Sequence, residues 1–89
     1  MPNYIPVASV QATGHITKEP DWRGRPRFVL PVKFTFAAPN APEARYKIAL
    51  ERKKDLPQAL AYYQSDAARG RLQAEVHNGQ VIATRQQIG

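Results

Sequence analysis

The residues best suited to binding chemistry lie together between Lys18 and Arg27. This segment reads K-E-P-D-W-R-G-R-P-R, which places Trp22 among four cations and two acids, with two prolines and a glycine that favour a loop. The cations attract phosphates, and an exposed indole is a flat surface on which a base stacks, worth roughly 1–3 kcal/mol per base. Alternatively, Trp22 folds into the core and the loop is merely solvated.

The charge balance favours the first interpretation. The chain has 13 Lys and Arg residues against 7 Asp and Glu residues, a formal net charge of +6. This excess attracts polyanions, nucleic acid first and an anionic membrane surface second. No apolar run approaches the roughly 20 residues of a membrane span, and the first residues lack the pattern of a secretory signal. We therefore expect a soluble, cytoplasmic protein.

Residue types that support catalysis or metal binding are scarce. The chain has no cysteine, which excludes disulfides, thiolate chemistry and cysteine-based zinc sites. His15 and His77 are far apart in sequence and are assigned no role. No Ser-His-Asp spacing or P-loop pattern occurs, and we assign Glu19 and Asp21 to tuning the loop charge or capping a turn. The sequence predicts a protein that is not an enzyme and has no cofactor or metal.

Alternation of apolar and polar residues predicts three strands in the first half of the chain. The first is expected over residues 8–17, with a small-residue inner face of Ala8, Val10, Ala12, Gly14 and Ile16. The second covers residues 28–36 and directs inward Phe28, Leu30, Val32, Phe34 and Phe36. The third covers residues 45–51 and directs inward Tyr46, Ile48 and Leu50. Phe34, Phe36 and Tyr46 are thereby assigned to the core.

The second half predicts a helix and a hairpin. Good helix formers run from Leu56 to Gln64, with Asp55 as N-cap and a proline tolerated in the first turn. Strands over 71–76 and 81–85 flank an Asn-Gly pair, a strong hairpin signal because both residues tolerate positive φ. No regular structure is expected over residues 1–6, the Trp22 loop and residues 38–44.

Three strands, a short helix and two strands follow the order of a five-stranded OB-type Greek-key barrel, all-β with one short helix. A five-stranded SH3-like barrel and an antiparallel sheet with one packed helix give similar strings. All 89 residues form one domain, 1–89, whose small size makes the core thin, so we expect self-association, with a homodimer favoured.

The stretch Q-A-T-G-H-I-T-K-E-P-D-W-R-G-R-P-R-F-V-L-P-V resembles the opening of bacterial and phage single-stranded DNA-binding proteins. The matching positions are Gly14, Ile16, Glu19, Pro20, Gly24, Pro26, Phe28 and Leu30. Further on, R-Y-K-I-A-L-E-R, L-P-Q-A-L-A-Y-Y and A-R-G-R-L-Q resemble the family's third strand, helix and late strand. The chain departs from the family in its short segment after the helix and in its end, Q-Q-I-G, where the family has an acidic tip. The resemblance implies strand binding without partner recruitment, as in short single-domain relatives.

An OB barrel carries its ligand on the outer side of the second and third strands, next to the flanking loops. Alternation places Lys33, Thr35, Arg45 and Lys47 on that side, and Arg69 and Arg71 extend it. The predicted nucleic-acid-binding residues are Lys18, Trp22, Arg23, Arg25, Arg27, Lys33, Arg45, Lys47 and Arg71. The alternative is a solvated sheet face without a ligand.

Three functions are compatible with these patterns. The first is a sequence-tolerant single-stranded DNA-binding protein acting in replication, recombination or plasmid and phage DNA metabolism. The second is an RNA-binding OB module, because backbone cations and stacking rings serve both polymers. The third is a protein-interaction or assembly barrel whose basic patch meets an acidic partner.

Overall fold

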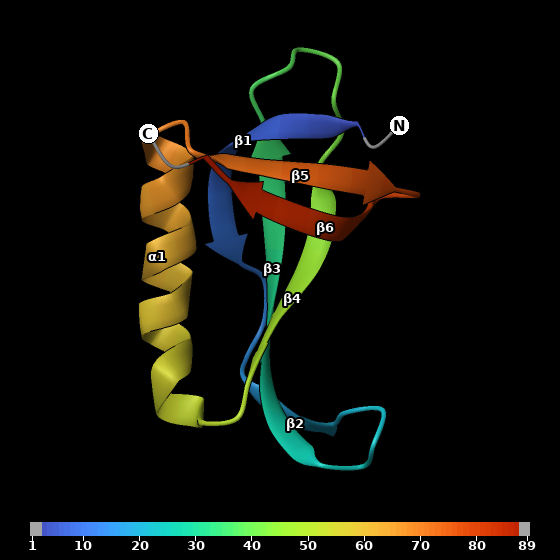
Figure 1. Ribbon diagram of the computed structural model, residues 1–89, viewed down its shortest axis with the longest axis vertical. Coiled ribbons are helices and arrows are strands. Elements are labelled where there is room, and N and C mark those ends of the chain that lie inside the picture. The colour runs from blue at the N-terminus through green and yellow to red at the C-terminus, as the bar shows by residue number, and fades with distance from the viewer. Residues whose placement is uncertain (1–2, 88–89) are drawn as a thin grey trace.

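A computed structural model describes residues 3–87, in which a single six-stranded sheet curls around the core (Figure 1). One α-helix and one turn of 3-10 helix (η1) lie between the fourth and fifth strands. The elements are β1 (Tyr4–Ala12), β2 (Thr17–Pro20), β3 (Pro26–Phe36), β4 (Ala44–Leu50), η1 (Lys53–Asp55), α1 (Leu56–Ala68), β5 (Leu72–His77) and β6 (Gln80–Gln86).

Five of the strands close into a barrel. The strand order is β1-β5-β6-β4-β3-β2, and a second pairing of β1 with β3 completes the ring. All neighbours are antiparallel except β4 and β6, which meet in parallel at Arg45 and Gln80, where the Arg45 amide donates to the Gly79 carbonyl at 2.8 Å. With a helix between its third and fourth barrel strands, this topology confirms the predicted OB-type Greek-key barrel.

The core lies inside this barrel and is built by the predicted alternation of β3 and β4. Leu30, Val32 and Phe34 are buried, and Ile48 is buried opposite Leu30. Phe34 is 0% exposed. Burying an aliphatic or aromatic side chain of this size contributes roughly 1.5–3 kcal/mol, so this row stabilises the strands whose outer face carries the candidate site.

The first strand differs from its prediction. β1 begins at Tyr4, because residues 4–6 pair with β5, so the expectation of no regular structure over residues 1–6 is wrong for this part; Met1 and Pro2 lie outside the described residues. A bulge between Val7 and Ser9 reverses the alternation. Val7 is therefore buried in place of the expected Ala8, whereas Val10 is buried as predicted. Ala12 and Gly14, which were also expected to face inward, are exposed, and Ile16 packs against the core.

The helix is four residues longer than predicted, ending at Ala68 instead of Gln64. Its end is a Schellman motif: the Gly70 amide donates to Ala67, the Arg71 amide donates to Asp66, and Gly70 has φ +70°. Asp55 takes the N-cap position, but its carboxylate accepts from the Arg52 Nε at 2.8 Å instead of capping the helix. None of the helices within residues 3–87 is long and apolar enough to cross a membrane.

The C-terminal hairpin confirms the Asn-Gly prediction. β5 and β6 are joined at Asn78 and Gly79, whose φ angles are 52° and 76°. Figure 1 shows this hairpin at one end of the molecule and the β2–β3 hairpin extending from the opposite end, with α1 along one side. The side chain of Gln64 on α1 donates to the Val10 carbonyl at 3.1 Å, so the helix provides a hydrogen-bond donor to the backbone of β1.

Candidate nucleic-acid interface

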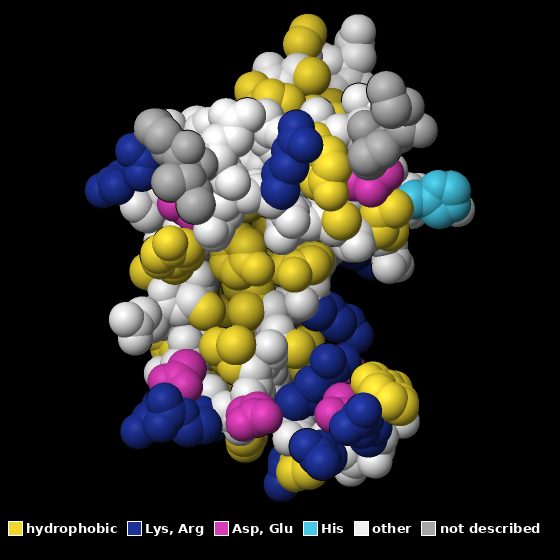
Figure 2. Space-filling view, in the orientation of Figure 1, with side chains coloured by type: hydrophobic (Ala, Val, Ile, Leu, Met, Phe, Trp, Pro, Cys, Tyr) yellow, Lys and Arg dark blue, Asp and Glu magenta, His cyan; other side chains and the backbone are white. Residues whose placement is uncertain are grey.

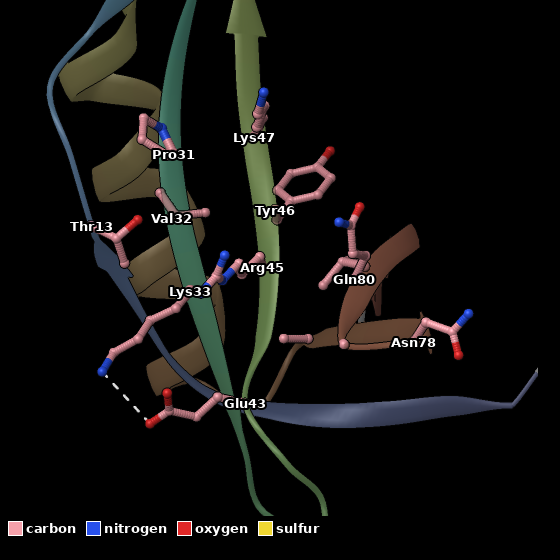
Figure 3. A pocket seen from close by; sticks show the side chains of 13 residues that line it. Thr13, Pro31, Val32, Lys33, Glu43, Arg45, Tyr46, Lys47, Asn78 and Gln80 are labelled. Carbon is pink, nitrogen blue, oxygen red and sulfur yellow. Dashed lines mark ion pairs between the residues drawn. The ribbon is translucent and has the colours of Figure 1, made fainter.

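An open groove of about 1130 Å³ runs over the outer face of β3 and β4 and reaches the β5–β6 turn. Figure 3 shows Lys33, Arg45 and Lys47 on the two neighbouring strands, with Asn78 and Gln80 across from β4. Lys33 stands directly opposite Arg45, and Lys47 stands opposite Pro31. The register therefore places three cations on one side of the sheet, as the alternation of both strands predicted.

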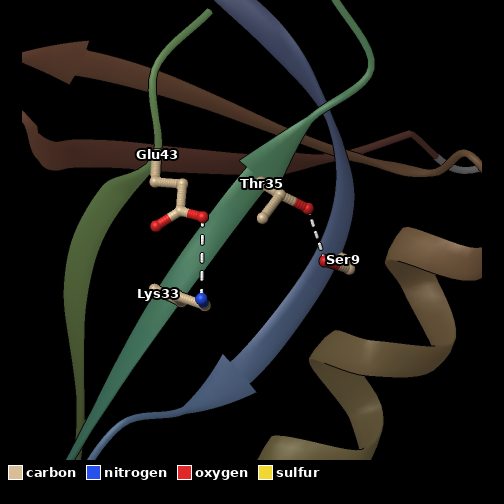
Figure 4. A network of polar contacts seen from close by, with 4 residues as sticks. All are labelled: Ser9, Lys33, Thr35 and Glu43. Atoms are coloured by element: carbon tan, nitrogen blue, oxygen red, sulfur yellow. Dashed lines mark hydrogen bonds and ion pairs between the residues drawn. The ribbon is translucent and has the colours of Figure 1, made fainter.

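The two lysines of the groove are paired with carboxylates. The Lys33 Nζ lies 3.6 Å from Oε1 of Glu43, in the loop before β4 (Figure 4), and the Lys47 Nζ lies 3.6 Å from Oε1 of Glu19 on β2. Figure 4 also shows Thr35, which is not among the residues that line the groove, hydrogen-bonded to Ser9. Arg45 is exposed and makes no ion pair within residues 3–87, so its charge is the least compensated of the three.

The turn between β2 and β3 presents Trp22 to solvent. One carboxylate oxygen of Asp21 accepts the Arg23 amide at 2.8 Å and the Arg25 amide at 2.9 Å, and Gly24 supplies the positive φ of +79°. Trp22 is 85% exposed, which excludes the alternative in which it fills the core. The Arg23 guanidinium lies over the indole, 4.5 Å from the ring centroid. Asp21 therefore caps this turn and holds an exposed, cation-flanked ring.

The pleating of β2 and β3 determines on which face of the sheet Arg27 and Lys18 lie. Arg27 pairs with Glu19 on the face of β3 that also carries Pro31 and Lys33, so it continues the basic face toward the tip. Lys18 pairs with Phe28, which packs against the core, so Lys18 lies on the opposite face. Because successive side chains point to opposite sides of a strand, Lys18 and Glu19 lie on opposite faces of β2.

Arg71 also lies apart from the groove. It follows the last turn of α1, where its amide donates to Asp66 and its carbonyl accepts from Gln87. Arg69 is at the C-cap of the same helix. Arg69 and Arg71, which were expected to extend the groove, are not among the residues that line it, because the longer helix places them at its C-terminal end.

The structure thus gathers two groups of predicted residues. Lys33, Arg45 and Lys47 form the first, which we call the groove cations. The second, which we call the hairpin group, contains Trp22, Arg23, Arg25 and Arg27. Figure 2 shows basic side chains gathered around the lower right of the molecule, below a hollow in its outline.

Several groove residues were not predicted. Asn78 and Gln80 line it because β6 joins β4, a long-range pairing that only the OB strand order indicates. Pro31 forms part of its floor. Its carbonyl accepts the Thr13 amide at 2.9 Å, and its missing N–H faces the bend between β1 and β2, where no ladder bond is required. A Cβ on Gly14 would lie 2.9 Å from Pro31 Cγ, so any larger residue here would force Pro31 or the bend to shift.

Beneath the groove, three aromatic rings pack against one another. Ring centroids are 5.4 Å apart for Phe34 and Tyr46, 6.0 Å for Tyr46 and Tyr63, and 6.3 Å for Phe34 and Tyr63. Burial, followed by the hydrogen bond with Tyr46, raises the pKa of Tyr63 to about 12. Tyr62, next to it on α1, is instead 60% exposed. Trp22 and Tyr62 are therefore the large aromatic side chains most available for stacking in residues 3–87.

Taken together, the fold and the site define a small OB-type barrel with a basic groove and an exposed indole at one end. Within residues 3–87, no group of three or more His, Asp and Glu side chains is placed to hold a metal ion. No protein-family model matches the chain, and searches of curated proteins and of solved structures found no significant match. Inference about function therefore depends on the chemistry of the site.

Proposed function

We propose that this protein binds single-stranded DNA in a sequence-tolerant manner across the groove and the hairpin group. One observation carries the proposal. The groove cations lie on the outer face of β3 and β4, the same face of β3 continues through Arg27 toward the β2–β3 turn, and that turn exposes Trp22. Cations that follow a backbone, joined to a ring that meets bases, are the elements of sequence-tolerant single-strand binding.

The dimensions support a single strand as ligand. From Lys33 to Arg27 the face of β3 covers six residue steps, or about 20 Å at the usual rise of a strand. An OB fold binds roughly 4–16 nucleotides, and a 20 Å face plus the hairpin turn accommodates a strand at the lower end of that range. The face presents no protruding recognition helix, because α1 lies against β1 on another side of the barrel.

The cellular setting belongs to the same proposal. Action in replication, recombination or the DNA metabolism of phages and plasmids rests on the resemblance of the first third of the chain. A homodimer is proposed from the small size of the domain, and sedimentation velocity at micromolar concentration tests it. A sharp monomer boundary across the concentration range would reject the dimer without affecting the proposed ligand.

The decisive experiment is a titration of labelled oligo-dT, oligo-U and duplex DNA at two salt concentrations. We expect oligo-dT to bind most tightly, to lose affinity steeply with salt and to quench Trp22 fluorescence. Arg45→Ala should weaken binding, whereas Arg69→Ala, which removes the same charge outside the groove, should have little effect. A preference for oligo-U would select the RNA-binding module. Retention of no strand at low salt would favour the protein-interaction barrel.

A further inference from the structure

Two of the three groove cations already have an anionic partner before any ligand arrives. Glu19 and Glu43 come from different segments, β2 and the β3–β4 loop, yet each lies 3.6 Å from a different groove lysine. Both pairs are at least partly exposed to solvent. A ligand phosphate that approached either ammonium group would meet a carboxylate at the same place.

The Glu19–Lys47 pair also spans β3. Glu19 stands beside Arg27 on one edge of β3, and Lys47 stands beside Pro31 on the other edge. Val29 lies on the same face, midway between these two rows. Although this face is the outer one, Val29 is only 1% exposed. The ion pair between the two side chains bridges these rows at the level of Val29.

We infer that Glu19 and Glu43 are internal competitors of the ligand phosphates, so that the groove is partly neutralised in the free protein. This inference rests on the proposed function. Binding exchanges carboxylate partners for phosphate partners at Lys33 and Lys47. The acids thereby lower affinity and ease release of the strand, while Arg45 remains open for the first contact.

The two carboxylate–lysine ion pairs are weak enough for a ligand phosphate to replace them. Exposed ion pairs are weak, and at 3.6 Å neither pair has the short geometry of a strong charge-assisted hydrogen bond. Replacing a competing carboxylate by an amide should therefore tighten binding by about two- to fivefold per site. The contrast with Asp21 is clear, since its carboxylate accepts two backbone amides and is committed to the turn.

The test uses Glu19→Gln, Glu43→Gln and the double variant, with Glu75→Gln as the matched control. Each single substitution removes one negative charge, which raises the net charge by one unit, and keeps the side-chain volume nearly unchanged. Glu75 lies on β5, paired with Tyr4 and Ala83, and does not line the groove. Affinity for oligo-dT is measured by anisotropy of a labelled oligomer between low and moderate salt.

We expect both groove variants to bind about two- to fivefold more tightly than wild type, the double variant to bind more tightly still, and Glu75→Gln to change affinity less than either. The slope of log affinity against log salt should steepen by up to about 0.7 for each lysine released. If wild type binds and the groove variants bind no more tightly than Glu75→Gln, the inference is wrong and the proposed function stands. If neither wild type nor the double variant retains oligo-dT at low salt, both are wrong.

Discussion

The groove and the hairpin group carry similar charge on very different supports. The groove cations lie on strands whose inner side chains form the core, with Phe34 fully buried on β3. The hairpin group lies on a two-stranded extension that protrudes from the barrel, with a turn stabilised by Asp21. In the groove, position comes from packing. At the hairpin it comes from local hydrogen bonds, so its side chains remain exposed and available.

The same kind of truncation should therefore have opposite consequences in the two regions. Phe34→Ala removes a side chain that is 0% exposed, and we expect it to lower the free energy of unfolding by about 3–5 kcal/mol. Trp22→Ala should leave the urea midpoint unchanged, because the indole is 85% exposed. Urea unfolding followed by circular dichroism measures both. An equal loss of stability in the two variants would contradict the division between a packed groove and a locally held hairpin.

Removing the cations of each region should reduce the affinity for DNA by different amounts. The triple variant Arg23→Ala, Arg25→Ala, Arg27→Ala should lose at least about tenfold in affinity for oligo-dT, with a salt slope shallower by about 2. The triple variant Lys33→Ala, Arg45→Ala, Lys47→Ala should lose less, because two of its cations are already paired with carboxylates. Salt-dependent anisotropy compares them at equal net charge. A larger loss in the groove variant would place the dominant contacts there.

Stacking at Trp22 should have an intermediate effect on binding. Trp22→Ala should weaken oligo-dT binding by about 1–3 kcal/mol, and Trp22→Phe should restore part of it, because the ring face and not the indole N–H is required. A labelled oligomer is the appropriate probe, since both variants lack the intrinsic fluorophore. Equal affinities of wild type and Trp22→Ala would remove the indole from the site and leave electrostatic binding alone.

The smallest expected effect concerns Tyr63, in the aromatic cluster beneath the groove. Its pKa is raised from 10.0 to about 12 in the folded protein, so the unfolded chain loses this proton first as pH rises. The stability contribution is complete below pH 10 and is lost between pH 10 and about 12. Absorbance at the phenolate band during alkaline titration should show one late-ionising tyrosine, absent in Tyr63→Phe. A titration identical in the two proteins would contradict the burial of this hydroxyl.

Sequence patterns were most informative where structure depends on neighbours in the chain. Alternation over residues 28–36 predicted both the buried row of β3 and the outward position of Lys33. Asn78 and Gly79 predicted the last turn. The pattern over residues 8–17 was right for Val10 but wrong for Ala8, because the bulge between Val7 and Ser9 buries Val7 in place of Ala8. The helix was predicted to end at Gln64, although Gly70 was a readable signal for the later end at Ala68.

The amino-acid sequence alone was sufficient to predict the succession of barrel strands and helix along the chain, the outer positions of the groove cations and the excess of positive charge. Tertiary structure alone decided that Trp22 faces solvent, that Lys18 and Arg71 lie apart from the groove, and that Glu19 meets Lys47 across β3. The reason is physical. The alternation of side chains along a strand and the chemistry of turns depend on a few neighbouring residues. Ion pairs between strands, and the residues that share one face of the sheet, depend on which strands become neighbours when the barrel closes.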